Sequence, residues 1–296
     1  MNEPILNHYV WAITLLTLAI ALGSLLLWLN QSLRKRLHFG TDQNKLLPWQ
    51  ITWVDLGIFI FALFISVFAC QSIASALLPD VPDVPDDESV LLNPSIAIIS
   101  ILTLQLPILI VHYAFQKFYS SDYALQLSTH KSHWFKDLKA SFLTFIQYLP
   151  LIWLCSIVWS FILSILQGLS WIEEFPVQPI IELLSRDLPL FQVLLIASFA
   201  IILAPIVEEI LFRGCFYRFL KGKLSILLAQ IISAITFAIV HGNLAAFLPL
   251  LLIGFILVRI YESSGSIKQA IFFHALFNAN SFLFMTLIKL SGIPLE

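Results

Sequence analysis

Long apolar segments divide the chain, and this pattern limits its fold more than any other feature of the sequence. A helix needs roughly 20 apolar residues to cross a bilayer. Eight segments come close to this length, at about 8–29, 54–77, 95–115, 140–167, 190–212, 225–241, 245–261 and 269–289. Charged residues make up only 11% of the chain, against about 25% in a typical soluble domain. We therefore predict an all-α polytopic membrane protein with about eight transmembrane helices.

The distribution of Lys and Arg predicts how the helices are oriented. When the loops are assigned alternately to the two sides, only Arg186 and Lys289 of the 16 basic residues fall on one side, which leaves 14 on the other. Basic residues favour the cytoplasmic side, so we expect loops 30–53, 116–139 and 213–224 to face the cytoplasm. Both termini are then outside, and the first apolar segment is a retained helix rather than a cleaved signal sequence.

Two adjacent glutamates, Glu208 and Glu209, lie in a segment that otherwise belongs in lipid. Ionisable groups at membrane depth are costly and usually mark a functional site. Glu209 and Arg213 have the i, i+4 spacing of an ion pair, with the acid first, which is the favourable order. Glu208 is left without a local counter-charge, which suits a general base or acid. The alternative is a structural charge cluster of all three residues at a helix end.

Two histidines recur in equally apolar surroundings. His241 ends one predicted helix. A lone histidine at such a position is more often a packed or interfacial side chain than a functional one. His274 and Asn278 are one turn apart and project from one face of the last predicted helix. At about 1.5 Å per residue, these side chains and Glu208 lie between ~10 and ~25 Å from the inner ends of their helices. These depths permit the side chains to meet near mid-membrane.

Pro205 precedes the acidic pair by one turn of the same predicted helix. A proline here removes a backbone N–H, frees a carbonyl one turn earlier and kinks the helix beside the glutamates. The alternative is an ordinary membrane-helix proline without a role at the site.

The signatures of other catalytic types are missing from the sequence. The chain has no His-Glu-x-x-His zinc motif, no Gly-x-Ser-x-Gly turn and no intramembrane Gly-Asp pair. Its three cysteines lack metal-type spacing and are expected to pack as small apolar side chains: Cys70, Cys155 and Cys215. The candidate catalytic groups that remain are a carboxylate, two imidazoles, an amide and an arginine. This set activates water and stabilises an oxyanion.

Three motifs in order resemble those of the CAAX-protease and bacteriocin-processing (CPBP, or Abi) family of intramembrane endopeptidases, which is related to the Ras-converting-type CAAX prenyl proteases. They are Glu208-Glu209-x-x-x-Arg213, Phe237-x-x-x-His241 and His274-x-x-x-Asn278. The resemblance implies an intramembrane catalytic core over residues 190–290. Residues 1–189 add transmembrane helices without a recognisable motif.

The resemblance also implies the residues of the site. The implied catalytic set is Glu208, Glu209, Arg213, His241, His274 and Asn278. Glu208 is the expected base that activates water, and His241 helps to hold that water. His274 and Asn278 are the expected oxyanion-stabilising pair.

Members of this family have been described both as metal-dependent and as metal-free. Glu209 and Arg213 are expected to orient the site or the substrate in either case. If a metal takes part, zinc is the candidate, with Glu208, His241 and His274 as three ligands and an open fourth position. We favour no cofactor, because the motifs lack the helical His pair of zinc proteases.

The expected substrate is a membrane-associated peptide or protein, and the expected location is the plasma (inner) membrane. No basic cluster with interleaved aromatics suggests nucleic acid as a partner. Two other functions stay open. One is a non-enzymatic immunity or scaffold protein that retains the fold. The other is a transporter whose buried glutamates relay protons, although proton relay does not require His274-x-x-x-Asn278.

Overall fold

The structure is a computed structural model, and every regular element that it describes is a helix, which confirms the all-α prediction. The described residues are 3–34, 46–77, 94–118, 127, 133–172 and 188–291. Part of the predicted orientation depends on loop residues that lie outside the described residues. These are 35–45, 78–93, 119–126, 128–132 and 173–187.

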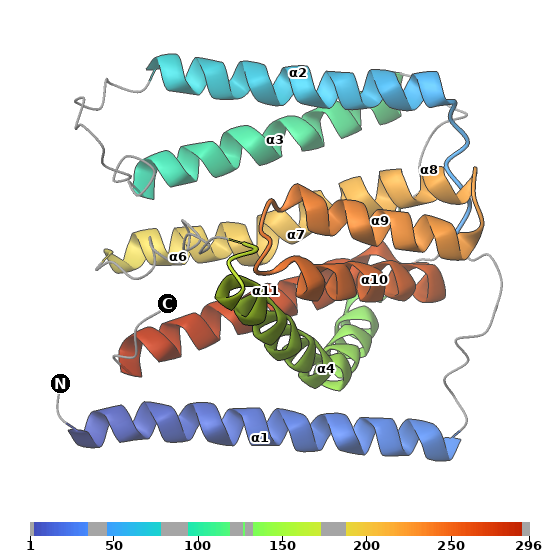
Figure 1. Ribbon diagram of the computed structural model, residues 1–296. Coiled ribbons are helices and arrows are strands. Elements are labelled where there is room, and N and C mark those ends of the chain that lie inside the picture. The colour runs from blue at the N-terminus through green and yellow to red at the C-terminus, as the bar shows by residue number, and fades with distance from the viewer. Residues whose placement is uncertain are drawn as a thin grey trace.

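The first four helices surround the rest of the chain (Figure 1). They are α1 (Glu3–Arg34), α2 (Trp53–Leu77), α3 (Pro94–Phe118) and α4 (Trp134–Gly168). Helices α2 and α3 pair along one flank of the molecule, while α1 lies on the opposite flank, where it packs against α4 and the last helix. The two ends of the chain lie on the same side of the bundle, as the predicted topology requires.

A continuous helical rod, Leu190–Lys221, runs through the middle of the molecule. It changes its winding along its length, from α6 (Leu190–Ser198) through the π-helical η3 (Phe199–Leu203), α7 (Ala204–Glu208) and the π-helical η4 (Glu209–Tyr217) to α8 (Arg218–Lys221). Three further helices follow, α9 (Ile226–Val240), α10 (Phe247–Ser264) and α11 (Ile267–Ser291).

The eight predicted transmembrane segments all correspond to helices in the structure, but they are not of equal length. Seven spans of the described chain are long and apolar enough to cross a membrane. The exception is α9, which has 15 residues and is therefore about 22 Å long. The Ser225 side chain caps its first turn by accepting a hydrogen bond from the Leu228 N–H, and its last residue precedes His241.

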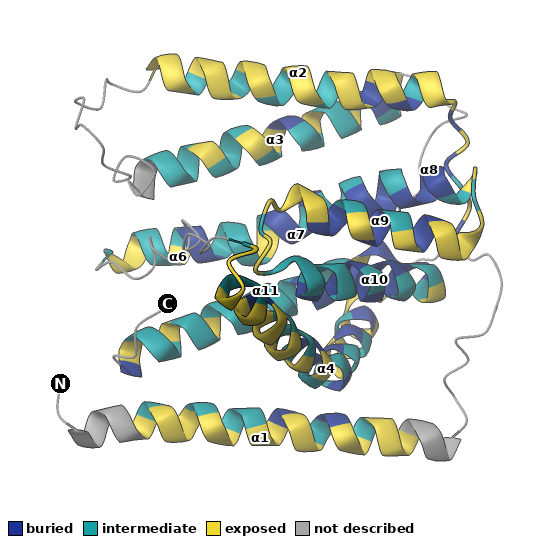
Figure 2. Cartoon of the chain, in the orientation of Figure 1, coloured by how far each residue is buried: buried dark blue, intermediate teal, exposed yellow. Residues whose placement is uncertain are grey.

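Burial in this molecule follows the pattern of a membrane protein (Figure 2). The outward faces of α1, α2 and α4 carry large apolar side chains that are exposed on the molecule and suit contact with lipid. The central helices α7 to α10 are the most buried. Several charged and polar side chains are buried among them, including Glu209, Arg213, Gln230 and His274. The polar groups that would be costly to expose to lipid are therefore concentrated in the protein interior.

An extended segment, residues 46–52, is packed against the end of the central rod. Its backbone accepts hydrogen bonds from two basic side chains, Arg218 Nε to the Leu47 carbonyl at 2.6 Å and Lys221 Nζ to the Leu46 carbonyl at 2.9 Å. The Trp49 N–H in turn donates to the Arg218 carbonyl at 3.0 Å, and the Trp49 ring is 3% exposed. Trp49 therefore belongs to the core.

Helices α9 and α10 approach each other closely at Gly254. A Cβ at this position would lie 3.2 Å from the Cα and carbonyl oxygen of Ala234 and from Cδ1 of Phe237. Small residues at helix contacts permit such an approach in membranes. Because Phe237 is on α9 and His241 directly follows this helix, this contact also fixes the position of the site.

We predict that Gly254→Ala destabilises the protein by about 1–3 kcal/mol, the usual cost of overpacking, because the neighbouring atoms are mostly backbone. Thermal unfolding in detergent measures the effect. Gly57→Ala on α2 is the matched control: its added Cβ meets nothing within 4 Å, and we expect an unchanged or slightly higher unfolding temperature. Equal effects of the two substitutions would contradict the close contact.

Candidate functional site

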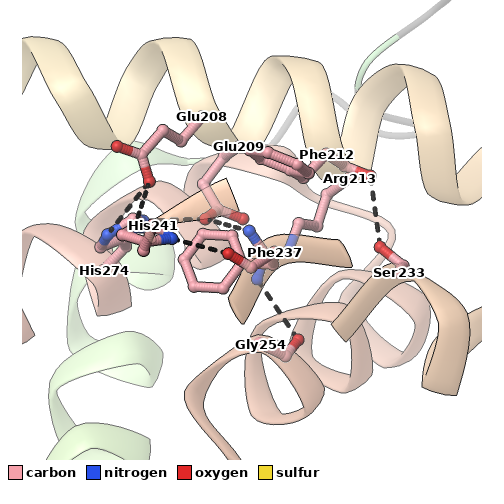
Figure 3. A network of polar contacts seen from close by, with 9 residues as sticks. All are labelled: Glu208, Glu209, Phe212, Arg213, Ser233, Phe237, His241, Gly254 and His274. Atoms are coloured by element: carbon pink, nitrogen blue, oxygen red, sulfur yellow. Dashed lines mark hydrogen bonds and ion pairs between the residues drawn. The ribbon is translucent and has the colours of Figure 1, made fainter. Parts of the chain in front are cut away.

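A buried ion pair extended by a histidine forms the centre of the site (Figure 3). Arg213 Nη1 donates to Glu209 Oε1 at 2.9 Å, and both side chains are completely buried. The same carboxylate oxygen lies 2.9 Å from Nδ1 of His274 on α11. The predicted pairing of Glu209 with Arg213 is thus present, and Glu209 also links the central rod to α11.

The Arg213 guanidinium has further partners on α9 and α10. Its Nη2 donates to the Gly254 carbonyl at 3.3 Å, and its Cζ lies 4.2 Å from the centre of the Phe237 ring. An aromatic face stabilises a desolvated cation. The carboxylate, the carbonyl and the ring together compensate a charge that would otherwise be very costly at this depth.

Glu208 points to a different place from Glu209, as their spacing on the helix predicts. Its Oε2 lies 3.7 Å from Nε2 of His241 and 3.9 Å from Nε2 of His274. These separations are too long for direct hydrogen bonds, and Oε2 has no hydrogen-bond partner among the described residues. The Glu208 and His241 side chains are 26% and 28% exposed. Contacts of this length between polar groups suit a bridging water.

The partners of the two imidazole rings fix which nitrogen carries the proton. His241 Nδ1 lies 2.6 Å from the Phe237 carbonyl, and a carbonyl only accepts, so Nδ1 is the donor. His274 Nδ1 donates in the same way to the Glu209 carboxylate, which is already paired with Arg213. In a neutral ring the Nε2 atom then carries a lone pair. Both rings therefore direct an Nε2 lone pair toward Glu208.

The π-helical turns on both sides of Glu208 explain the local geometry of the rod. In η3 the Ala204 N–H donates to the Phe199 carbonyl, five residues back. The next N–H in this pattern would belong to Pro205, which has none, so the Ala200 carbonyl loses its helical donor. Asn278 Nδ2 donates to this carbonyl at 2.7 Å. The predicted freeing of a carbonyl by Pro205 is thus present, and Asn278 compensates it.

The residues were also compared with the requirements of a metal site. The chemistry of Glu208, His241 and His274 suits zinc, since each ring donates its other N–H to an acceptor, as metal-binding histidines do. In the described part of the chain, however, no group of three or more His, Cys, Asp or Glu side chains is placed to hold a metal ion. As they stand, these three side chains do not enclose a metal position.

The structure brings together most of the side chains predicted from the sequence. Glu208, Glu209, Arg213, His241 and His274 form one cluster. Asn278 is the exception: the only hydrogen bond of its side chain in the described structure is to the Ala200 carbonyl. Sequence reasoning did not identify the Gly254 carbonyl and the Phe237 ring as the partners of Arg213. A glycine within an apolar helix is the signal that points to Gly254.

The part of the chain that carries this site is similar to a known family. Residues 190–280 match the family model described as Rce1-like, type II CAAX prenyl endopeptidase. No curated protein and no solved structure matches the chain. The family match confirms the resemblance predicted from the three motifs. Within this multi-pass helical membrane protein, residues 190–280 are thus similar to the CAAX-protease-like intramembrane endopeptidases.

Removing one partner of the buried ion pair should cost more than removing both. Arg213→Met leaves the Glu209 carboxylate buried without its cation, so we expect a loss of about 3–5 kcal/mol of stability. In the double variant Glu209→Gln with Arg213→Met, neither charge is left uncompensated, and much of this loss should be recovered. Thermal unfolding in detergent tests both. A double variant no more stable than Arg213→Met would contradict the pairing.

Proposed function

We propose that this protein is an intramembrane endopeptidase that hydrolyses a peptide bond of a membrane-associated peptide or protein with a water activated by Glu208. One observation carries the proposal. Glu208 Oε2 faces the Nε2 atoms of His241 and His274 at 3.7 and 3.9 Å, within a segment that matches an endopeptidase family.

Glu208 and His241 have complementary tasks in the proposed reaction. The water lies between Glu208 Oε2 and His241 Nε2 and donates a hydrogen bond to each. As the water oxygen attacks the carbonyl carbon, its proton passes to the Glu208 carboxylate. The protonated carboxyl then donates this proton to the leaving amine nitrogen when the C–N bond breaks. Glu208 thus acts first as general base and then as general acid.

The oxyanion of the tetrahedral intermediate needs hydrogen-bond donors, and His274 and Asn278 are assigned to it. Asn278 has two amide N–H groups, of which one is directed to the Ala200 carbonyl and the other is available to a substrate. His274 donates from Nε2 when its ring holds both protons. Fixed donors of this kind stabilise the developing charge without reorganisation.

Glu209 and Arg213 are assigned a positioning task. Glu209 Oε1 binds the Nδ1 side of His274, so it fixes the orientation of this ring toward Glu208. Arg213 holds Glu209 in turn. Because both side chains are completely buried, they act through His274 and not through the substrate.

We also propose that residues 190–290 form the catalytic core and that residues 1–189 support it. Helix α4 packs against α10 and α11, and α1 packs against α4 and α11. Ser24 Oγ and Trp28 Nε1 of α1 both donate to the Gln147 carbonyl of α4. These contacts hold α11, which carries His274 and Asn278, against the rest of the site.

The first test is Glu208→Gln, which should abolish cleavage of a quenched-fluorescent peptide that the wild-type protein cleaves. Stability should be unchanged, because Glu208 Oε2 has no direct hydrogen bond to lose. The matched control is Glu262→Gln, the same change at a carboxylate bound to Tyr217 and Lys221. It should keep its activity per folded molecule. Near wild-type cleavage by Glu208→Gln would rule out the assigned base.

The second test concerns the metal. Strong chelators should leave the cleavage rate unchanged, and the purified active protein should hold no stoichiometric zinc by elemental analysis. Glu208 is free to act as a base only if it is not a ligand. One equivalent of zinc that chelation removes together with activity, and that His241→Ala fails to bind, would replace this proposal with a metal-dependent one.

A further inference from the structure

A second buried carboxylate, Asp137, joins the start of α4 to the start of α11. Asp137 lies in the first turn of α4 and is 3% exposed. Its Oδ1 accepts a hydrogen bond from Gln269 Nε2 at 2.8 Å, and its Oδ2 accepts one from Ser266 Oγ at 3.1 Å. Hydrogen bonds to an ionised acceptor are stronger than those between neutral groups. The two helices are therefore held together here by directional, charge-assisted contacts.

Two further contacts continue along the same face of α4. Ser141, one turn on from Asp137, donates from Oγ to the Gln269 carbonyl at 2.9 Å. Another turn on, the Phe145 ring packs edge-on against the Phe273 ring, with 6.0 Å between their centres. Residues four apart lie on one face of a helix. This face of α4 therefore follows α11 from its start to the residue that directly precedes His274.

The polar end of this contact sets how far α11 lies along its own axis. Apolar packing is not directional, so rings such as Phe145 and Phe273 can slide past each other at little cost. Hydrogen bonds need a defined distance and angle, and a buried polar group that loses its partner is costly. A slide of α11 by one residue, about 1.5 Å, would break both bonds to Asp137. One axial position of α11 is therefore strongly preferred.

The axial position of α11 matters because this helix carries two residues of the site. His274 follows Gln269 by five residues, about 7.5 Å along the helix, and Asn278 is one turn further. Both side chains contact the central rod: His274 Nδ1 binds Glu209 Oε1 at 2.9 Å, and Asn278 Nδ2 donates to the Ala200 carbonyl at 2.7 Å. Contacts of this length do not survive a slide of the helix.

We infer that Asp137 is a positioning residue for the site, which acts from α4 through α11. Through Ser266 and Gln269 it sets the axial position of α11. This position in turn sets where His274 and Asn278 stand relative to the central rod. The effect on cleavage rests on the proposed function, whereas the effect on the position of α11 does not.

Disulfide cross-linking measures the position of α11 without an activity assay. In a background without the three native cysteines, Ala200→Cys together with Asn278→Cys places two thiols where α11 contacts the rod. We expect a disulfide to form readily on mild oxidation. Asp137→Ala removes both acceptors without adding bulk, so it should slow disulfide formation several-fold. Asp137→Asn still accepts from Gln269, and its amide can donate to the Ser266 hydroxyl, so it should restore the rate.

Two further variants keep this test decisive. Gln269→Met removes one of the two bonds to Asp137 and leaves the other, so it should slow the reaction less than Asp137→Ala. The matched control is Glu262→Ala, which removes a carboxylate that ties α10 to the rod through Tyr217 and Lys221 and should not change the rate. An unchanged rate in Asp137→Ala and Gln269→Met, or equal slowing in Glu262→Ala, would overturn the inference.

Cleavage of a quenched-fluorescent peptide then tests the effect on the site. Asp137→Ala should lower kcat per folded molecule by about 10- to 100-fold, as small misplacements of a site do. KM should be unchanged, because the oxyanion donors act only in the transition state. Asp137→Asn and Glu262→Ala should keep kcat. Normal kcat despite slowed cross-linking would overturn the positioning role. No cleavage by the wild-type protein, with cross-linking as expected, would overturn the proposed function alone.

Discussion

The buried ion pair of Glu209 and Arg213 is the interaction on which the rest of the structure depends. Two charges at membrane depth are stable only when protein groups compensate them, and among the described residues only Glu209 Oε2 and Arg213 Nε of this pair lack a hydrogen-bond partner. That requirement brings three helices to one point, since the guanidinium binds Gly254 of α10 and Phe237 of α9 while the carboxylate binds His274 of α11. The close contact at Gly254 and the burial of the central helices both help to compensate the charges of Glu209 and Arg213. Once these groups are fixed, Glu208 is the acidic group left facing the Nε2 atoms of His241 and His274.

The winding of the central rod places the two adjacent carboxylates in different environments. Glu208 ends an α-helical turn and Glu209 begins a π-helical one, and π-helical turns occur frequently at functional sites. The register depends on Pro205, whose missing N–H leaves the Ala200 carbonyl to Asn278. Asn278 thus has a structural partner in the rod as well as its assigned task at the oxyanion. A side chain held in this way loses less freedom when a substrate binds.

Much of this arrangement could be predicted from the sequence, and the parts that could not have physical reasons. Apolar segment lengths gave the helices, and the i, i+4 rule gave the pairing of Glu209 with Arg213. Helical spacing predicted that Glu208 and Glu209 point apart. The sequence could not show that His274 binds Glu209 through one nitrogen and faces Glu208 with the other, because this depends on how α11 packs on the rod. The π-helical turns could not be predicted either, since no local sequence pattern distinguishes them from α-helix. The segment that forms the short α9 resembled an ordinary transmembrane span.

The position of the attacking water is tested most directly by an experimental structure with a peptidyl phosphonate, which mimics the tetrahedral intermediate. We predict one phosphonate oxygen within hydrogen-bonding distance of Glu208 Oε2 and His241 Nε2, in the space where these groups now stand 3.7 Å apart. A second oxygen should accept hydrogen bonds from His274 and from the second amide N–H of Asn278. A phosphonate that inhibits the protein while bound without contact to Glu208 would contradict the assignment of this carboxylate as the catalytic base.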